Sequence, residues 1–453
     1  MPDVLQEGKN KIKKVLMVAR VFPPYSSVGH SVRVIKFIKY LPTLGWLPVV
    51  LTVDDEKEYE YYPKQGSASL LSDIPQEVSI HRTSAGEPSS EFLEKERKFG
   101  QQNFLTAFIV KILGGARRFI FRNFLLPDRE LSWLLFAVSL GQKIIQNEGI
   151  DAIFVTCPPH SAALIGAVLK RLTGKPLIID FRDDWIDTPW FNSMPKFRRM
   201  IERRLENWAI KIADKVTLVT EWSQQSFIDR YPNQPKEKFV FISNGCDLED
   251  FSFLKSMPPL LPNNSKFRIV HAGSLNDSKN WTRTPMTIFQ AIQHLLQEQP
   301  NLKEKLTLAF TGFLPERQKQ LVNEMGLSDV VKELGFVPRD DLYCLMKESE
   351  MLLVINYEGF ATLIPGKIYE YWAVGGPPIL LLSCSGAASG FIEKYKLGIS
   401  VDPSDVSGIE QAILNVYREN EELAPQHIST TGIEAYDRQV LSGKLAQILS
   451  NIN

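Results

Sequence analysis

The sequence predicts an α/β protein built from two Rossmann-like, doubly wound domains that face each other across a cleft. Short apolar runs alternate with segments of helical periodicity, a pattern typical of parallel sheets covered by helices on both faces. The alternation occurs on both sides of SFLKSMPPLLPNNSK (252–266), a stretch rich in Pro and Asn that is typical of a linker. The chain has 453 residues, which is too long for a single hydrophobic core.

The apolar runs give the expected strands in order. In the first domain they lie at 15–19, 46–53, 152–156, 177–181, 216–220 and 239–242. In the second domain they lie at 268–272, 306–311, 330–334, 351–355, 379–382 and 399–401. A last helical segment follows at 433–449. We expect domains at 1–255 and 266–425, with 426–453 forming a C-terminal helix that packs back on the first domain.

Bulk composition argues against several classes of protein. Lys plus Arg and Asp plus Glu both number 52, so no net field attracts nucleic acid. The four cysteines are scattered without a CxxC pair, which argues against structural zinc and a disulfide framework and fits a reducing cytosol. The N-terminal segment is polar and basic, and no run of about eighteen uncharged apolar residues occurs. We expect no secretory signal, no transmembrane helix and a cytoplasmic location.

The segment 365–379, PGKIYEYWAVGGPPI, combines a Pro-Gly loop, a short helix and an apolar strand. The first N–H groups of a helix lack partners within it, and the helix dipole adds positive charge, so such a junction attracts anions. Lys367 can add a full charge, and Glu370 lies one turn further on the same side. Phosphates at the helix start and a carboxylate for sugar hydroxyls suit a nucleotide sugar. The alternative is a surface αβ unit with an unrelated Lys and Glu.

A loop near the N-terminus is a second candidate, because ligands of open α/β sheets bind at the carboxyl ends of strands. FPPYSSVGHS (22–31) contains Gly29, which would let the backbone approach a ligand. The neighbouring His30 is either a ligand contact or an ordinary exposed histidine. The loop lacks the full dinucleotide-binding fingerprint, so taken alone it is weak support for a site.

The corresponding loop of the second domain runs from Gly273 to Asn280, contains Lys279 and leads to Arg283 near a helix start. Two cations at the N-terminus of a helix oppose its dipole. A bound anion would offset that conflict, whereas the alternative is solvated surface charge.

DFRDDWID, at 180–187, follows a predicted strand directly and is expected to point into the cleft. Four carboxylates, one Arg and one Trp in so short a segment look too polar for core packing. The alternatives are a metal site, contacts to sugar hydroxyls or to an acceptor, and an ion-pair network that holds the loop.

Two segments combine apolar and basic residues. They are 104–126, FLTAFIVKILGGARRFIFRNFLL, and a predicted helix that includes 196–204, KFRRMIERR. Such surfaces suit peripheral binding to anionic lipid, and hence a lipid-linked acceptor. The alternative is an ordinary helix pair packed on the first domain, with arginine stems lying along apolar surface.

Taken together, these motifs resemble the retaining GT-B glycosyltransferases, specifically the family 4 group that includes many bacterial polysaccharide enzymes. The resemblance covers nearly the whole chain. The motifs that carry it are FPPYSSVGHSVRVIKFIKYLPTLGW, LPDRELSW, TCPPHSAALIG, DFRDDW, ADKVTLVTEW, FISNGCDLEDF, HAGSL, LGFVPRDDL and PGKIYEYWAVGGPPI.

The resemblance implies a role for each candidate residue. Glu370 is expected to hold the ribose hydroxyls of the donor. The other expected donor-binding residues lie near its diphosphate and are Gly29, Gly273, Gly366, Lys367 and Ile368. Lys279 and Arg283 correspond to the basic pair that stabilises the leaving phosphate. Arg182 and Asp183 occupy the place where many relatives have a His that contacts the transferred sugar. These last four are the expected catalytic residues.

Two departures from the family pattern are visible. The commonest pattern has two glutamates eight residues apart, whereas Glu358 lies twelve residues before Glu370. Ser274 stands where many members carry Arg, which leaves Lys279 and Arg283 to supply the charge.

The reaction implied by the resemblance is transfer of a hexosyl or related group from a nucleotide sugar to a glycan or lipid-linked acceptor. Retention is expected, with no metal or other cofactor. The location would be cytoplasmic, with peripheral binding to the inner face of the plasma membrane through 104–126 and 196–204. The alternatives are a non-catalytic nucleotide-sugar-binding subunit and a GT-B-fold sugar-nucleotide epimerase or phosphorylase.

Overall fold

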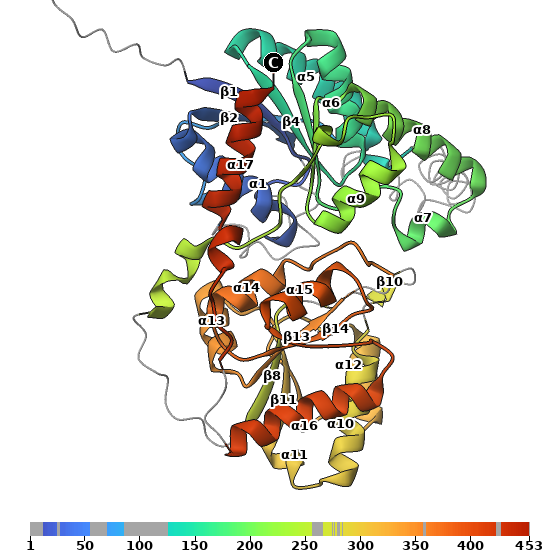
Figure 1. Cartoon of the computed structure of the whole chain (residues 1–453), viewed down its shortest axis with the longest axis vertical. Helices are drawn as coiled ribbons and strands as arrows, with labels where there is room; N and C mark the ends of the chain where they lie inside the picture. Colours follow the sequence, from blue (N-terminus) through green and yellow to red (C-terminus); the bar gives the residue numbers. More distant parts are fainter. Residues whose placement is uncertain are drawn as a thin grey trace, which may run out of the picture.

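The computed structural model describes residues 12–24, 28–54, 70–85, 126–255, 266–273, 275, 277–278, 281–282, 284–356, 359–422 and 427–452. In these ranges two parallel sheets lie in separate domains, one above the other in Figure 1. Helices cover both faces of each sheet, so the predicted fold class is confirmed.

The first sheet has the strand order β3-β2-β1-β4-β5-β6-β7, and every pairing is parallel. Its strands are β1 (Lys13–Val18), β2 (Trp46–Val53), β3 (Ser79–Thr83), β4 (Ala152–Cys157), β5 (Leu177–Phe181), β6 (Lys215–Leu218) and β7 (Phe239–Phe241). Its helices are α1 (Val28–Tyr40), α5 (Leu134–Glu148), α6 (Ser161–Thr173), α7 (Pro189–Ser193), α8 (Lys196–Ile212) and α9 (Glu221–Arg230).

The central strands of this sheet are buried on both faces, as near-continuous apolar runs require. Along β1, Leu16 and Val18 pack with α5 and α6, whereas Val15 and Met17 pack with α1 on the opposite face. This alternation is the two-residue period of a strand.

The second sheet has the order β12-β11-β8-β13-β14-β15 and is also parallel. Its strands are β8 (Phe267–His271), β11 (Leu306–Phe310), β12 (Val331–Glu333), β13 (Met351–Ile355), β14 (Ile379–Leu382) and β15 (Gly398–Val401). Its helices are α10 (Met286–Glu298), α11 (Leu302–Lys305), α12 (Glu316–Glu324), α13 (Arg339–Glu348), α14 (Lys367–Val374), α15 (Ala387–Tyr395) and α16 (Val406–Glu422).

Most strands lie within two residues of the positions that the apolar runs predict. The exceptions are β3 and the short antiparallel pair β9 (Asp277–Ser278) and β10 (Trp281–Thr282), which the sequence did not indicate. β3 is an edge strand of sequence SIHRT whose residues are exposed or half-buried, so it lacks the apolar run of a buried strand.

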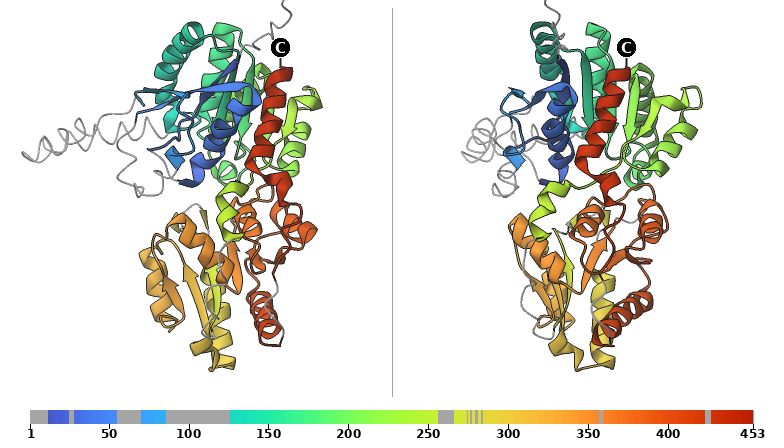
Figure 2. Two further views of the ribbon diagram at one scale, coloured as in Figure 1. Left: turned by 90° about the vertical axis from the view of Figure 1, so that its left-hand side faces the viewer. Right: turned by 60° about the vertical axis from the view of Figure 1, so that its left-hand side comes forward.

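The last helix, α17 (Arg438–Asn451), lies in the first domain although it follows the second in sequence (Figures 1 and 2). Leu441, Leu445 and Leu449 are fully buried, in one cluster with Phe37 and Ile38 of α1. α17 therefore covers α1 and completes that side of the first domain.

The chain crosses between the domains twice, and the two crossings pair with each other. Cys246 forms a parallel bridge with Asp437. Its N–H donates to the Tyr436 carbonyl at 3.2 Å, and its carbonyl accepts from the Arg438 N–H at 2.9 Å. Beside this bridge, a Cβ atom on Gly245 would lie 1.9 Å from the Tyr436 carbonyl oxygen, so only glycine fits.

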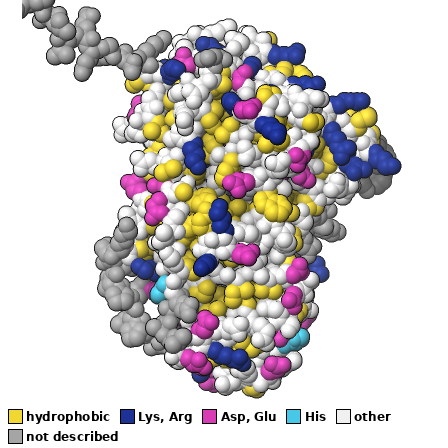
Figure 3. Space-filling model, viewed as in Figure 1, with side chains coloured by type: hydrophobic (Ala, Val, Ile, Leu, Met, Phe, Trp, Pro, Cys, Tyr) yellow, Lys and Arg dark blue, Asp and Glu magenta, His cyan; other side chains and the backbone are white. Residues whose placement is uncertain are grey.

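No helix among the described residues is long and apolar enough to cross a membrane. Of the two apolar and basic segments, 104–126 lies outside the described residues apart from Leu126, whereas 196–204 forms the first half of α8. Figure 3 shows Lys and Arg side chains gathered on the right-hand edge of the first domain, where Figure 1 places α8.

Candidate functional site

The candidate site centres on α14, which is short and held by its own apolar residues. Gly366 precedes the helix, and Gly375 ends it in the left-handed conformation at φ 63°. The buried side chains Ile368, Tyr369, Tyr371, Trp372 and Val374 anchor α14 to the second domain. Lys367 and Glu370 are only partly buried, so their charged ends remain available to the site.

Lys367 lies against the end of β8. Its Nζ is 3.5 Å from Nε2 of His271 and 2.7 Å from the position of a Cβ atom on Gly273. Gly273 has φ +105°, a conformation that side-chain-bearing residues rarely adopt. The structure thus brings together two of the predicted donor-binding residues.

Tyr371 ties the same helix to the sheet. Its hydroxyl accepts a hydrogen bond from the Ala272 N–H at 2.8 Å and donates to the Leu353 carbonyl at 3.3 Å. The N–H of Gly273 donates to Oγ1 of Thr311 at 3.2 Å. The start of α14 and the loop after β8 are therefore held at a fixed distance.

Ile368 contributes to the site as an anchor. Its side chain is fully buried, and its N–H donates to the Pro365 carbonyl at 3.1 Å. The Tyr369 N–H likewise donates to the Gly366 carbonyl oxygen at 3.2 Å. The amides of this junction that can face an anion are therefore those before Ile368.

Glu370 lies deep in the site but keeps some access to solvent. Burial raises the pKa of its carboxyl group, while the charges of Lys367 and Arg438 act in the opposite direction. Arg438, at the start of α17, is 5% exposed, and its Nε and Nη1 have no hydrogen-bond partner among the described residues. Its guanidinium supplies positive potential that partly offsets the effect of burial on this carboxyl group.

The segment 180–187 was expected to be too polar for core packing. That expectation is wrong, because several of its side chains are buried. Asp180 is 1% exposed and accepts hydrogen bonds from Thr156, Thr217 and both Nε and Nη2 of Arg33, at 2.7–3.1 Å. Burial alone would raise the pKa of Asp180, but Arg33 and the two hydroxyl groups lower it below its ordinary value. For Asp180 the ion-pair alternative therefore holds.

Asp184 and Trp185 of the same segment are also buried. The indole N–H of Trp185 donates to Glu202 at 3.0 Å. Asp184 accepts from Ser223 Oγ at 2.6 Å and from Thr362 Oγ1 at 3.2 Å, so it links the two domains. Partners distant in sequence make this polar segment compatible with burial.

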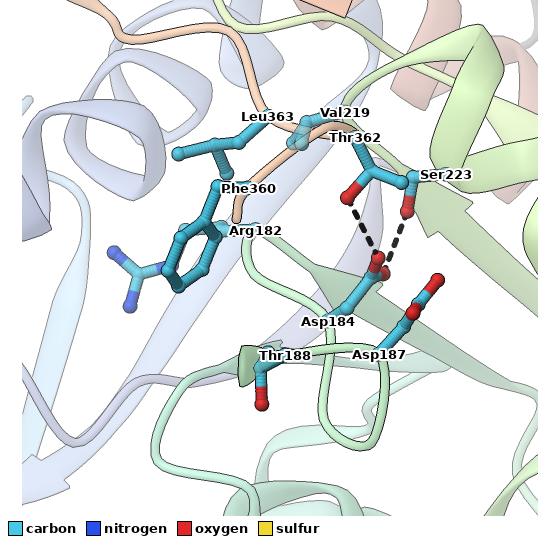
Figure 4. A pocket seen from close by; sticks show the side chains of 9 residues that line it. All are labelled: Arg182, Asp184, Asp187, Thr188, Val219, Ser223, Phe360, Thr362 and Leu363. Carbon is cyan, nitrogen blue, oxygen red and sulfur yellow. Dashed lines mark hydrogen bonds between the residues drawn. The ribbon is translucent and has the colours of Figure 1, made fainter. Parts of the chain in front are cut away.

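Arg182 and Asp183 lie beside this contact. The Arg182 guanidinium donates to the carbonyls of Cys157 and Pro158 at 3.3 and 2.7 Å. Arg182 also lines a small cavity between the domains, with Asp184, Asp187, Thr188, Val219, Ser223, Phe360, Thr362 and Leu363 (Figure 4). In Figure 4 its guanidinium points away from Asp184 and Ser223.

A histidine that the sequence did not single out lies next to Asp183. His160, in the TCPPH motif, has Nε2 3.5 Å from the Asp183 carbonyl, and its ring stacks on Trp185 at 5.1 Å. Burial lowers the pKa of His160 to about 4, so the ring is neutral at pH 7. The sequence signal for it was its place after a strand, in a motif noted only for its resemblance.

The second domain reaches this region through 359–363, just before the Pro365-Gly366 junction. Thr220 Oγ1 donates to the Thr362 carbonyl at 2.6 Å, and the rings of Trp190 and Phe360 lie 5.0 Å apart. The segment that leads into α14 is therefore docked on the first domain.

For several of the predicted site residues, the structure does not describe the side chain or the whole residue. Gly29 lies in the first turn of α1, and the side chain of His30 is not described. Lys279, Arg283, Ser274 and Glu358 lie outside the described residues. Within the described ranges, no group of three or more His, Cys, Asp and Glu side chains is arranged to hold a metal ion.

Comparison with known proteins adds two family matches. Residues 29–250 match the family model Glycosyltransferase Family 4, and residues 266–419 match the model Glycosyl transferases group 1. The boundary between the matches falls at the Pro- and Asn-rich stretch. No curated protein matches the chain in sequence.

Solved structures match over the whole length. HepE from Anabaena, in complex with UDP and glucose, has 17% identity and a TM-score of 0.62, with 97% of this chain and 100% of that chain covered. A glycosyltransferase from Rickettsia africae has 16% identity and a TM-score of 0.61, covering 97% and 98%. Sucrose-phosphate synthase from Thermosynechococcus elongatus has 12% identity and a TM-score of 0.63, covering 97% and 98%. At such identities the likeness shows the fold.

Proposed function

Because the chain belongs to the family 4-like glycosyltransferases of the GT-B fold, we propose that α14 and the loop after β8 form its donor site. In this proposal a nucleotide sugar, with UDP-sugars the first to test, donates its sugar to a glycan or lipid-linked acceptor with retention. UDP is favoured because HepE, which shares the fold, is described in complex with UDP and glucose. The observation that carries the proposal is the convergence of Gly273, Lys367 and Glu370 at one sheet edge.

Each of these residues has a distinct part in the proposed reaction. The Glu370 carboxyl group accepts hydrogen bonds from the ribose hydroxyls, and the nearby charges of Lys367 and Arg438 oppose the rise in its pKa that burial causes. As the sugar leaves, negative charge builds on the diphosphate. Lys367 stabilises that charge from a position fixed in advance, so no solvent has to reorganise during the reaction. Because Gly273 has no side chain, the Lys367 ammonium group can lie close to the end of β8.

The acceptor is proposed to enter from the side of the first domain, past Arg182, Asp183 and His160. Its hydroxyl attacks the anomeric carbon from the face that the diphosphate leaves, and a diphosphate oxygen takes its proton, which gives retention. The charge of the leaving group is then met by Lys367 and the α14 amides, with Lys279 and Arg283 as further cations. No metal ion has a part in this proposal.

A lipid-linked acceptor is supported by the surface of α8. Phe197 and Met200 are 53% and 48% exposed, beside the exposed basic side chains of Lys196, Arg203 and Arg204. Apolar and cationic side chains together favour the surface of an anionic bilayer. We therefore place the enzyme on the cytoplasmic face of a membrane.

Donor binding is tested by thermal shift with a panel of nucleotide sugars, because a ligand of the native state alone raises Tm by mass action. The expected result is a rise in Tm with one sugar nucleotide, and release of nucleoside diphosphate when an acceptor is added. The matched control is Glu370→Gln, in which both effects should be reduced. A panel without any shift, or a shift unchanged in Glu370→Gln, would refute the donor site.

Membrane binding is tested by flotation with vesicles that contain anionic or only zwitterionic lipid. We expect flotation with anionic vesicles and its loss in the double variant Arg203→Glu and Arg204→Glu. Lys303→Glu with Lys332→Glu, on exposed side chains of the second domain, makes the same charge change away from α8. Equal losses in both double variants would show that general charge, and not α8, is responsible.

A further inference from the structure

His271 is a fully buried imidazole at the end of β8, in a strand of sequence FRIVH. A buried polar ring is costly unless its nitrogens have hydrogen-bond partners. Both ring nitrogens of His271 have polar neighbours. One is on β13 and the other is Lys367, at the start of α14.

The first neighbour determines which nitrogen carries the proton. Nδ1 lies 3.0 Å from the Leu353 carbonyl oxygen, which can only accept a hydrogen bond. Nδ1 must therefore be the protonated nitrogen. In a neutral ring Nε2 is then left with a lone pair and can only accept.

The second neighbour fits that assignment. The Lys367 ammonium has three N–H donors and no acceptor, and its Nζ lies 3.5 Å from Nε2. On the other side, Nζ lies 2.7 Å from the Cβ position of Gly273. A flexible lysine is thus confined between an acceptor and a glycine.

We propose that His271 is a positioning residue of the donor site: its Nε2 lone pair holds the Lys367 ammonium beside Gly273, where the donor diphosphate is bound. This inference rests on the proposed function. Fixing a long side chain before the ligand arrives removes the entropy that ordering it would otherwise take from binding and catalysis. His271 itself does not touch the substrate in this arrangement.

Two conservative variants separate the two ring nitrogens. In His271→Asn the side-chain amide can replace Nδ1–H toward Leu353 but does not reach Lys367. In His271→Gln the amide oxygen can replace Nε2 as acceptor for Lys367. We expect His271→Asn to lower kcat about tenfold, the size of one charged hydrogen bond, and His271→Gln to recover most of it. Equal kcat values in the two variants would overturn the proposal.

A double variant shows whether His271 acts through Lys367. In a Lys367→Met background, His271→Asn should lower kcat no further, because the contact is already lost. A further tenfold loss would assign His271 a purely structural role. If Lys367→Met and Glu370→Gln leave turnover at the wild-type level, the proposed donor site itself is wrong, which is a different outcome.

A spectroscopic measurement needs no activity. The protein has six histidines, and a long-range ¹H–¹⁵N spectrum of the ¹⁵N-histidine protein reports the tautomer of each ring. The His271 signals, assigned by their loss in His271→Gln, should show the Nδ1–H tautomer. Its Nε2 resonance should shift in Lys367→Met and stay unchanged in Lys396→Met, at an exposed lysine that directly follows α15. An Nε2–H tautomer, or an Nε2 resonance that Lys367→Met leaves unmoved, would overturn the proposal.

Discussion

The Nζ atom of Lys367 lies 2.7 Å from the point where a Cβ atom of residue 273 would stand, so Lys367 and Gly273 share a space too small for both a side chain and an ammonium. The two residues come from different elements, the loop after β8 and the first turn of α14. Glycine at 273 is therefore favoured by its φ of +105°, and a side chain there would displace the flexible end of Lys367.

Gly273→Ala should impair donor binding by displacing the Lys367 ammonium. We expect the KM for the donor to rise about tenfold, as for the loss of one charged hydrogen bond, together with a modest fall in Tm. Steady-state kinetics and thermal unfolding provide the two readouts. Gly45→Ala is the control, because Gly45 has φ +85° and nothing within 4 Å of its Cβ position. A similar change of KM in both variants would contradict the steric explanation.

Glu370→Gln should weaken the donor complex while the fold is retained. The amide keeps the shape of the carboxylate but loses its charge, so hydrogen bonds from ribose hydroxyls become weaker. The dissociation constant of the donor should rise about tenfold to a hundredfold. Isothermal titration with the donor and with its nucleoside diphosphate measures the effect. Glu393→Gln, on the exposed surface of α15, should leave both constants unchanged.

Asp184→Asn should stabilise the protein at neutral pH and have little effect in acid. Burial raises the pKa of Asp184 to about 6, from an ordinary value of 3.8, against the opposing effects of Ser223 and Arg230. Between these values the folded protein binds a proton that the unfolded chain does not, so stability falls as pH rises from about 4 to about 6. The side-chain amide of Asp184→Asn does not ionise, so the variant does not lose stability in this way as pH rises.

The measurement is Tm of the wild type and Asp184→Asn across pH 4 to 8. The gain should grow with pH and level off above about pH 6, at no more than about 3 kcal/mol. Asp187→Asn, at an exposed residue of the same loop, is the comparison. A gain that is constant with pH would show that charge burial at Asp184 is not its cause.

Gly245→Ala should separate the two chain crossings. Its methyl group would lie 1.9 Å from the Tyr436 carbonyl oxygen, a backbone atom that cannot move without breaking the Cys246 bridge. We expect a loss of about 3 kcal/mol and a lower Tm. Gly443→Ala, inside α17 with open space at its Cβ position, should instead stabilise by up to about 1 kcal/mol. If Gly245→Ala unfolds like the wild type, the crossings are looser than their contacts indicate.

Sequence patterns were sufficient for the fold where strands are buried on both faces. β2, β5, β13 and β14 begin and end where the apolar runs do, because a run of Val, Ile and Leu has no other place than a central strand. β3 was missed for the opposite reason. Its residues, SIHRT, are exposed or half-buried because β3 lies at the edge of the sheet. They pair with β2 through the backbone, which does not require apolar side chains.

Side-chain partners were much harder to predict, because they are distant in sequence. Asp180 belongs to a segment expected to point into the cleft, and its ion-pair partner, Arg33, lies 147 residues away. His271 was hidden inside a strand motif, and its role depends on Lys367, 96 residues later. The sequence analysis assigned Gly273 and Lys367 to the same donor site but did not predict their contact. The positive φ of Gly273 and the space that the lysine occupies beside it depend on the tertiary structure.

The position of α17 also bears on how the chain is made. Leu441, Leu445 and Leu449 pack against α1, which precedes the whole second domain in the chain. That side of α1 has no cover until α17 has been synthesised, so the first domain cannot finish folding before the second has been translated. The domain that precedes the other in the chain is therefore completed only after it.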